Sequence, residues 1–435
     1  MLLNEHVKMA EQPAKGMECV ECGQVYPIAL TNYSTCHFAP LNLVYRPSGD
    51  LRARIESGPN NLFRYLDFLP NSRGPDYDVG MTHLVRTDEL ADATGFERGK
   101  LYLKFDEGSI SRTFKDRGVA VVTELVNEAN RNGANYTALG GTSTGNLLKA
   151  IAASAQRNGL SSIVVVHESA NPRLIEDAVA LGSYVIKIDS NYSKADSLMK
   201  LIVTNHPKIT SRMITVNMES RPVYGEGSKT IGFEIAEQLG WTVPDNVVHP
   251  AAAGLSSSRI YKGLQQAFEF GLVQRLQTKM NIVQTEACDP IVQAWQCGEP
   301  FEIIPIQNPG TSVAETLCVG NPSNGMDVLN ALKASNGAAI SVSDREILEG
   351  MDLVGNYTDF ATEPVGGAVI AGTRRLLANG SIRPDELTVL VLTDSYRKGS
   401  QITIPGGIKS GELIEVEAKS TALKSVLEEI LGITA

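Results

Sequence analysis

A single lysine, Lys115, stands at the start of a segment whose pattern predicts an amphipathic helix. Apolar residues recur at helical spacing from Val119 to Ala129, so Lys115 lies in or just before the first turn. The helix dipole disfavours an ammonium at that end, which makes the amine easier to deprotonate. A deprotonated amine is what a Schiff-base lysine needs. The alternative is a solvated surface lysine paired with a neighbour such as Asp116, and the spacing alone favours this alternative.

Two other turns have polar groups where a helix begins. The turn Thr142–Asn146 precedes a predicted helix at 146–157, and its backbone and hydroxyl groups could donate to a carboxylate. An ordinary helix N-cap explains the same turn. The loop Pro250–Leu255 follows a predicted strand and precedes a helix at 260–268, where backbone N–H groups and the helix dipole favour an anion.

The elements that must position these residues alternate between strand and helix. Strands are predicted at 136–139, 163–166, 184–188 and 213–216, and helices at 146–157, 172–181 and 193–203. Short β-branched runs between amphipathic helices indicate parallel strands with right-handed crossovers, hence a doubly wound α/β sheet. The alternation resumes after Tyr224 with buried strands at 247–248, 281–285 and 388–392.

Three local signals refine this picture. Ser343–Glu346 has the sequence of a capping box that opens a helix, and Asn379-Gly380 closes the helix that starts near Val365. The stretch from Ile306 to Met326 is rich in Pro, Gly, Asn and Ser, which predicts a long connection that could act as a lid.

Composition excludes several classes of protein. The chain has 435 residues, 43% hydrophobic and 20% charged, with a formal net charge of −10, which is ordinary for a soluble protein of two domains. No dense basic run is present, so we expect no nucleic-acid partner. No apolar stretch approaches the roughly 20 residues that cross a bilayer, and Met1–His6 lacks the pattern of a signal peptide. We therefore expect a cytoplasmic protein without a membrane partner.

Six cysteines in so long a chain fit reduced thiols, but three of them gather near the start. Cys19 and Cys22 are separated by two residues and precede a glycine, which is half of a zinc-ribbon pattern, and Cys36 begins the second half. The fourth thiol is missing because position 39 is Ala39. Only His37 or a remote residue could close a structural zinc site, and a ribbon that has lost its metal is the alternative.

The hexapeptide around the lysine, Thr113-Phe114-Lys115-Asp116-Arg117-Gly118, is similar to the Ser-Phe-Lys-Asp-Arg-Gly of threonine synthases. These enzymes use pyridoxal 5'-phosphate (PLP) on the tryptophan-synthase-β fold, called fold type II. Further segments resemble the family in its order, namely Arg64–Pro70, Met81–Arg86, Leu101–Gly108, Ser143–Asn146, Ala253–Leu255 and Glu363-Pro364. The resemblance covers roughly Asn60 to Lys398, and many relatives carry a similar amino-terminal ribbon.

The resemblance implies roles for particular residues. Lys115 would form the imine with the cofactor, Asn146 would lie beside its ring oxygen, and Thr393 would face its pyridine nitrogen. The phosphate would be held by the loop residues Ala251, Ala252, Ala253, Gly254 and Leu255. Ser143 and Thr144 would present donors to a substrate carboxylate. Lys104, Ser111, Arg112 and Arg259 are close in sequence to these loops and could hold a substrate phosphate. Arg112 replaces a family glycine, so an exposed side chain is the alternative for this residue.

The chain departs from the family pattern at two cofactor loops. Three alanines replace glycines in the phosphate loop, which restricts left-handed backbone there. The segment from Thr393 to Lys398 reads Thr-Asp-Ser-Tyr-Arg-Lys where threonine synthases tend to have Thr-Gly-His-Gly-Leu-Lys. If Asp394 rather than Thr393 faced the ring, the electronics of the cofactor would change.

The expected activity is that of a PLP-dependent lyase resembling threonine synthase, which converts O-phosphohomoserine and water to threonine and phosphate. One alternative is a sibling elimination or replacement enzyme acting on phosphoserine, serine or threonine. A second is a catalytically silent protein that keeps the fold.

The expected architecture is two doubly wound parallel-sheet domains with a small zinc-ribbon-like extension. The extension spans residues 1–50, a large PLP-binding domain spans 51–112 and 215–435, and a small mobile domain spans 113–214. By resemblance, we expect a homodimer.

Overall fold

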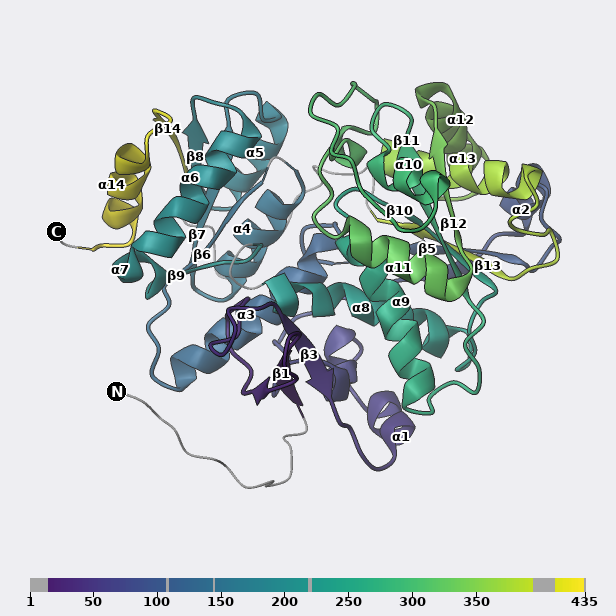
Figure 1. Cartoon of the computed structure of the whole chain (residues 1–435), viewed down its shortest axis with the longest axis horizontal. Coiled ribbons are helices and arrows are strands. Elements are labelled where there is room, and N and C mark those ends of the chain that lie inside the picture. Colours follow the sequence, from purple (N-terminus) through teal and green to yellow (C-terminus); the bar gives the residue numbers. More distant parts are fainter. Residues whose placement is uncertain (1–14, 107–108, 144, 218–220, 394–410, 434–435) are drawn as a thin grey trace.

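The structure is a computed structural model, which describes residues 15–106, 109–143, 145–217, 221–393 and 411–433. Within these residues the strands form a small antiparallel ribbon and two larger sheets that lie in separate lobes (Figure 1). Helices α3 (Lys115–Arg131) and α8 (Arg221–Gln238) pack against each other where the lobes meet. None of the described helices combines the length and the apolar character that crossing a bilayer requires.

The larger lobe is built on a sheet with the strand order β12-β11-β10-β13-β5-β4. These strands are β4 (Leu84–Arg86), β5 (Leu101–Phe105), β10 (Asn246–Pro250), β11 (Lys279–Thr285), β12 (Ala338–Val342) and β13 (Thr388–Leu392). All neighbours are parallel except β4, which pairs antiparallel with β5. The sequence patterns did not predict the two edge strands of this sheet, β4 and β12.

Helices cover both faces of this sheet, because successive strand residues point to opposite sides. On β10, Val247 packs into a cluster with α8, α9, α10 and α11, whereas Val248 packs into a cluster with α2, α12 and α13. The helices are α2 (Asp88–Thr94), α9 (Leu255–Glu269), α10 (Pro290–Cys297), α11 (Gly325–Ser335), α12 (Asp344–Tyr357) and α13 (Pro364–Ala378). This doubly wound arrangement confirms the predicted fold class.

The smaller lobe contains a parallel sheet with the order β14-β8-β7-β6-β9. Its strands are β6 (Ala138–Thr142), β7 (Ser161–His167), β8 (Tyr184–Ile188), β9 (Met213–Thr215) and β14 (Glu412–Val416). Its helices are α4 (Leu147–Arg157), α5 (Pro172–Ala180), α6 (Tyr192–Asn205), α7 (Pro207–Thr210) and α14 (Ser420–Ile430). One face packs against α3, α4 and α5, and the other packs against α6, α7 and α14.

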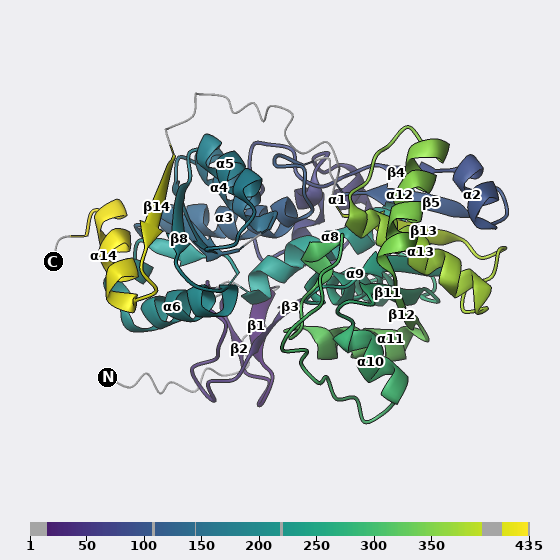
Figure 2. The same ribbon diagram turned by 90° about the horizontal axis from the view of Figure 1, so that it is seen from above.

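The carboxyl-terminal segment corrects the predicted domain boundaries. Residues 215–435 were all expected in the larger domain, but β14 pairs with β8 over its full length (Figure 2). Leu423 and Leu427 of α14 are buried in the same cluster as Ile186 of the smaller lobe. The chain therefore ends in the smaller lobe, where β14 pairs with β8 and the apolar side chains of α14 are buried.

The amino-terminal ribbon consists of β1 (Lys15–Cys19), β2 (Val25–Tyr26) and β3 (Leu41–Tyr45), in the order β2-β1-β3. Its strand β3 contacts α8, and two short helices, α1 (Leu51–Glu56) and η1 (Leu62–Phe68), follow the ribbon. Its core is small and is centred on Met17, Leu41 and Leu43. Such a core supplies little stabilisation by itself.

The predicted capping box is present at the start of α12. Glu346 N donates to Ser343 Oγ, and Ser343 N donates to the Glu346 carboxylate 2.9 Å away. Replacing Ser343 by alanine removes one cap acceptor, so we expect a loss of about 1 kcal/mol in the free energy of unfolding. Chemical denaturation of S343A against wild type checks this value, and a loss below about 0.3 kcal/mol would contradict it.

Candidate active site

Lys115 is the first residue of α3, as predicted, and its side chain is half-buried. Its Nζ lies 4.2 Å from the centroid of the Phe114 ring. The backbone N–H of Phe114 donates to the carbonyl oxygen of Thr393 at 3.3 Å. The structure therefore brings Thr393, at the end of β13, next to the helix that begins with the candidate lysine.

The start of α8 packs against the starts of both α3 and α9. A Cβ added at Gly118 of α3 would lie 2.5 Å from the Tyr224 ring, and one at Gly225 would lie 3.2 Å from Leu255 Cδ1. These short distances show that the backbone of α8 passes close to both helices. The amino-terminal ends of α3 and α9 thus flank the same first turns of α8, and both ends carry the positive pole of a helix dipole.

The predicted phosphate loop ends in a left-handed glycine that caps α9. Gly254 has φ +90°, and a Cβ there would lie 2.7 Å from Val328 Cγ2 and 3.0 Å from the Asn324 carbonyl oxygen. Ala253 O accepts a hydrogen bond from Asn324 N at 2.9 Å. Ala251, Ala252 and Ala253 have no positive φ, so they fit a loop whose left-handed position is already a glycine.

His249, directly before this loop, is a residue that the sequence reasoning missed. It is 1% exposed, its Nδ1 lies 3.0 Å from Ser257 Oγ, and its Nε2 has no hydrogen-bond partner among the described residues. Burial, together with a smaller effect of the positive charge of Lys115, lowers the pKa of His249 to about 3. The ring is therefore neutral at physiological pH. The sequence feature that could have indicated this residue is a single histidine in an apolar strand directly before the predicted phosphate loop.

Asn146 caps the start of α4 and is 8% exposed, but its side chain makes no capping hydrogen bond. Ser143 Oγ accepts from Gly145 N at 3.2 Å, so this hydroxyl shapes the turn. Thr144 lies outside the described residues. A Cβ at Gly145 would lie 3.8 Å from Thr316 Cγ2, which places the 306–326 connection of the larger lobe against this turn of the smaller lobe.

Lys104 does not take the predicted substrate-binding position. It is fully buried, and its Nζ donates to Glu234 Oε2 at 2.7 Å and to Gln238 Oε1 at 2.9 Å. Burial lowers its pKa, and the carboxylate of Glu234 opposes that effect. A lysine committed to a buried ion pair cannot also reach a substrate phosphate, so we assign Lys104 to the scaffold.

Ser111 is buried as well, and it shapes the loop before Lys115. Its backbone N–H and its hydroxyl both donate to the carboxylate of Asp116, at 2.8 and 2.7 Å. Burial raises the pKa of Asp116 to about 7, although the hydrogen bonds from Ser111 act in the opposite direction. Ser111 therefore fixes the entry to α3 rather than facing a substrate.

Arg117 anchors the first turn of α3 in a buried charge network. Its guanidinium pairs with Asp106 at 2.7 Å and donates to Glu234 Oε2 at 2.8 Å. Burial alone would raise the pKa of Glu234, but the charges of Arg117 and Lys104 outweigh it and lower the pKa to about 2. The network ties α3, β5 and α8 together directly beneath Lys115.

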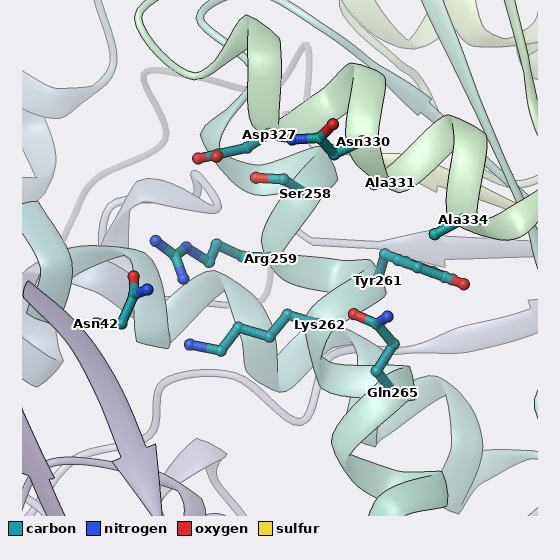
Figure 3. A pocket seen from close by; sticks show the side chains of 10 residues that line it. All are labelled: Asn42, Ser258, Arg259, Tyr261, Lys262, Gln265, Asp327, Asn330, Ala331 and Ala334. Carbon is teal, nitrogen blue, oxygen red and sulfur yellow. The ribbon is translucent and has the colours of Figure 1, made fainter. Parts of the chain in front are cut away.

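Arg259 lies one turn into α9, at a polar cavity of about 330 Å³. Figure 3 shows Arg259 and Lys262 extending from α9 toward Asn42 of the ribbon, with Asp327 on α11 nearby. Lys262 Nζ donates to Glu226 Oε1 at 3.1 Å, and an Arg259 nitrogen lies 3.6 Å from the same oxygen. The cavity therefore combines basic side chains with a wall that the ribbon supplies.

The predicted metal ligands Cys19, Cys22 and Cys36 gather at one end of the ribbon, together with His37. All six cysteines are free thiols.

The segment after Thr393 is the second place where the sequence departs from the family pattern. Its residues Asp394 to Lys398 lie outside the described residues.

Comparison with known proteins identifies the class of protein to which this fold and site belong. Residues 76–394 match the family of pyridoxal-phosphate dependent enzymes, and the chain belongs to that family. The chain is 31% identical to threonine synthase of Methanocaldococcus jannaschii over 95% of its own length and 99% of that protein. It is 33% identical to threonine synthase of Methanosarcina acetivorans over 89% of its own length and 93% of that protein. The chain is therefore a member of the threonine synthase family.

Solved structures share the fold at lower sequence identity. Threonine deaminase isoform 2 of Solanum lycopersicum superposes with a TM-score of 0.60 at 20% identity, covering 81% of this chain and 96% of that one. L-serine ammonia-lyase of Rhizomucor miehei superposes with a TM-score of 0.59 at 19% identity, covering 73% and 94%. These matches confirm the fold type II architecture.

Proposed function

We propose that this chain is a PLP-dependent threonine synthase, converting O-phosphohomoserine and water to threonine and phosphate. The observation that carries the proposal is the position of Lys115 at the start of α3, where the preceding residue Phe114 is hydrogen-bonded to Thr393 at the end of β13. The family membership and the anion-binding loop at the start of α9 support it.

The described residues fit the cofactor. Lys115 would hold it covalently, the loop Ala251–Leu255 would bind its phosphate, and Asn146 and Thr393 would contact its ring. His249 Nε2, buried without a partner among the described residues, offers a polar contact that a bound group would satisfy. When bound, the cofactor withdraws electrons from the substrate's α carbon and so eases loss of a proton there.

Lys115 would then serve as general acid and base. Its Nζ would take the proton from the α carbon of the substrate and return protons in the later steps. Ser143 and the start of α4 would bind the substrate carboxylate, because backbone N–H groups there favour an anion. The 306–326 connection, which contacts the Gly145 turn through Thr316, would limit the entry of water.

A product assay tests the proposed substrate. The purified, cofactor-loaded enzyme is incubated with O-phosphohomoserine, and phosphate and threonine are measured in parallel. We expect equimolar release of both. Phosphoserine, serine and threonine are assayed under the same conditions, and faster turnover of any of them would replace this proposal with the sibling elimination or replacement enzyme.

The phosphate loop gives a prediction with a matched control. A Cβ at Gly254 would meet Val328 and the Asn324 backbone at a left-handed position, so we expect G254A to weaken PLP binding by about tenfold or more, since 1.4 kcal/mol suffices for that factor. Gly271 is also left-handed, with φ +74°, but nothing lies within 4 Å of its Cβ position. Fluorescence titration with PLP should leave G271A near wild type, and equal affinities for the two variants would refute the assigned loop.

We also propose a homodimer in the cytoplasm, without a nucleic-acid partner. The six free cysteines suit a reducing compartment, and the acidic composition disfavours nucleic acid. Light scattering of the purified protein should give about twice the chain mass of 46.8 kDa.

A further inference from the structure

We infer that the amino-terminal ribbon holds one structural zinc ion, bound by Cys19, Cys22, Cys36 and His37. The ligand atoms of these four residues all lie within 4.8 Å of one another. Tetrahedral zinc with Zn–S bonds of about 2.3 Å separates its sulfur ligands by roughly 3.8 Å. Cys22 Sγ and Cys36 Sγ are 3.5 Å apart, so this pair already has nearly that spacing.

The first pair of ligands is presented by a turn with the backbone of a zinc knuckle. Gly23 has φ +71° and donates its N–H to Cys19 O at 2.9 Å, while Cys19 N donates to Gln24 O at 2.9 Å. This fold of the chain points the Cys19 and Cys22 thiols to the same side. Cys19 is buried and Cys22 is exposed, as suits a site at the edge of a small domain.

The second pair of ligands, Cys36 and His37, explains how the site is completed without a fourth cysteine. Residues 35–37 form a turn, and Phe38 continues it in the left-handed region with φ 50°. In a turn, adjacent side chains need not point in opposite directions as they would in a strand. His37 can therefore stand beside Cys36, while Ala39 packs into the ribbon core at the position where the sequence lacks a thiol.

The ion would hold the ribbon against the catalytic lobe. The Tyr45 hydroxyl of β3 donates to Glu226 Oε2 at 2.8 Å, and Lys15 Nζ donates to the carbonyl oxygens of Leu66 and Asn71 at 2.6 and 2.7 Å. Lys229 Nζ lies 4.0 Å from the centroid of the Tyr45 ring. Because the ribbon core is small, the metal supplies stability that hydrophobic burial cannot. Loss of the metal would release the contact between Tyr45 of the ribbon and Glu226 of α8, the helix that packs against α3.

Metal analysis of the full-length protein tests the inference, independently of the proposed activity. After reconstitution with zinc under reducing conditions and removal of excess metal, we expect about one zinc per chain by mass spectrometry of the metal. C22S should lose it, whereas the control C297S, which removes an exposed cysteine of α10, should retain it. Less than about a tenth of an equivalent in the wild type, or full occupancy in C22S, would overturn the site.

Cobalt substitution identifies the fourth ligand. In a tetrahedral site, H37C should keep the metal and raise the sulfur-to-cobalt charge-transfer absorbance by roughly one third, since four thiolates replace three. H37A should bind cobalt at least tenfold more weakly. Unchanged affinity and spectrum in H37A would show that His37 is no ligand, and a Cys22–Cys36 disulfide in the reduced preparation would replace the metal site by a thiol pair.

The stabilising role has its own readout. Chelation of the wild type should lower its melting temperature to that of C22S, and the chelator should not change C22S further. Y45F should lose part of the same stabilisation while keeping its zinc. Equal melting temperatures with and without metal would remove the role assigned to the ion, even if zinc were bound.

Discussion

Replacement of Lys115 by alanine should abolish turnover and the visible absorbance of covalently bound cofactor. Lys115 is the amine at the start of α3 and the residue that would attach PLP and move the substrate's protons. Removing a group that acts in every step should lower kcat by at least about 10⁴-fold. Absorbance spectra and phosphate release from O-phosphohomoserine, measured on the same preparation, check both parts.

A second lysine provides the control for this variant. Lys333 is exposed and pairs with Glu299 at the surface, so K333A should keep the spectrum and at least half of the activity. Retained turnover in K115A would remove Lys115 from the catalytic role. A normal spectrum in K115A would show that another amine carries the cofactor.

Replacement of Arg117 by methionine should destabilise the folded chain by about 3–5 kcal/mol, the usual effect of removing one partner from a buried ion pair. Methionine fits the apolar part of the space but, among the described residues, leaves the carboxylates of Asp106 and Glu234 with Lys104 as their one paired cation. Chemical denaturation measures the loss in the free energy of unfolding. R117M should also bind PLP more weakly, because the first turn of α3 loses its anchor.

The matched control is an arginine at the surface. Arg98 pairs with Asp92 in an exposed position, so R98M should cost less than about 1 kcal/mol. Similar losses in R98M and R117M would contradict the assignment of the buried network as the main anchor of α3.

The same network makes stability depend on acid. The pKa of Glu234 is about 2 in the folded chain and its ordinary value is 4.5, so the folded state binds fewer protons in this interval. The resulting stabilisation is fully present above pH 4.5 and is lost as the pH falls toward 2. E234Q should show a flatter dependence of the unfolding free energy over this window than wild type, and an unchanged slope would exclude Glu234 as the source.

The sequence predicted the parts of the fold that local pattern determines. Strand β13 (Thr388–Leu392) and strand β8 (Tyr184–Ile188) have the predicted bounds because their apolar runs are bounded by turn residues. The helix start at Lys115 and the capping box at Ser343 follow from residue types in one turn. The pairing of β14 with β8 could not be predicted, because it joins segments more than 200 residues apart and leaves no local signature.

The candidate site shows the same division. The resemblance proposed Lys115, the loop at Gly254 and Thr393 as site residues, and in the structure Phe114 N donates a hydrogen bond to Thr393 O. Lys104 was misassigned because its partner Glu234 lies 130 residues away in sequence and its burial is a tertiary property. His249 was missed for the same reason, since only the fold reveals that its Nε2 is buried without a hydrogen-bond partner among the described residues.

The most direct test of the account is to find where the cofactor is attached. The purified, PLP-loaded wild type is reduced with borohydride, which makes the lysine linkage permanent, and its peptides are mapped by mass spectrometry. We expect the pyridoxyl group on Lys115, in the peptide that begins the helix α3. Attachment to any other lysine, or no attachment in protein that releases phosphate from O-phosphohomoserine, would contradict the assigned site.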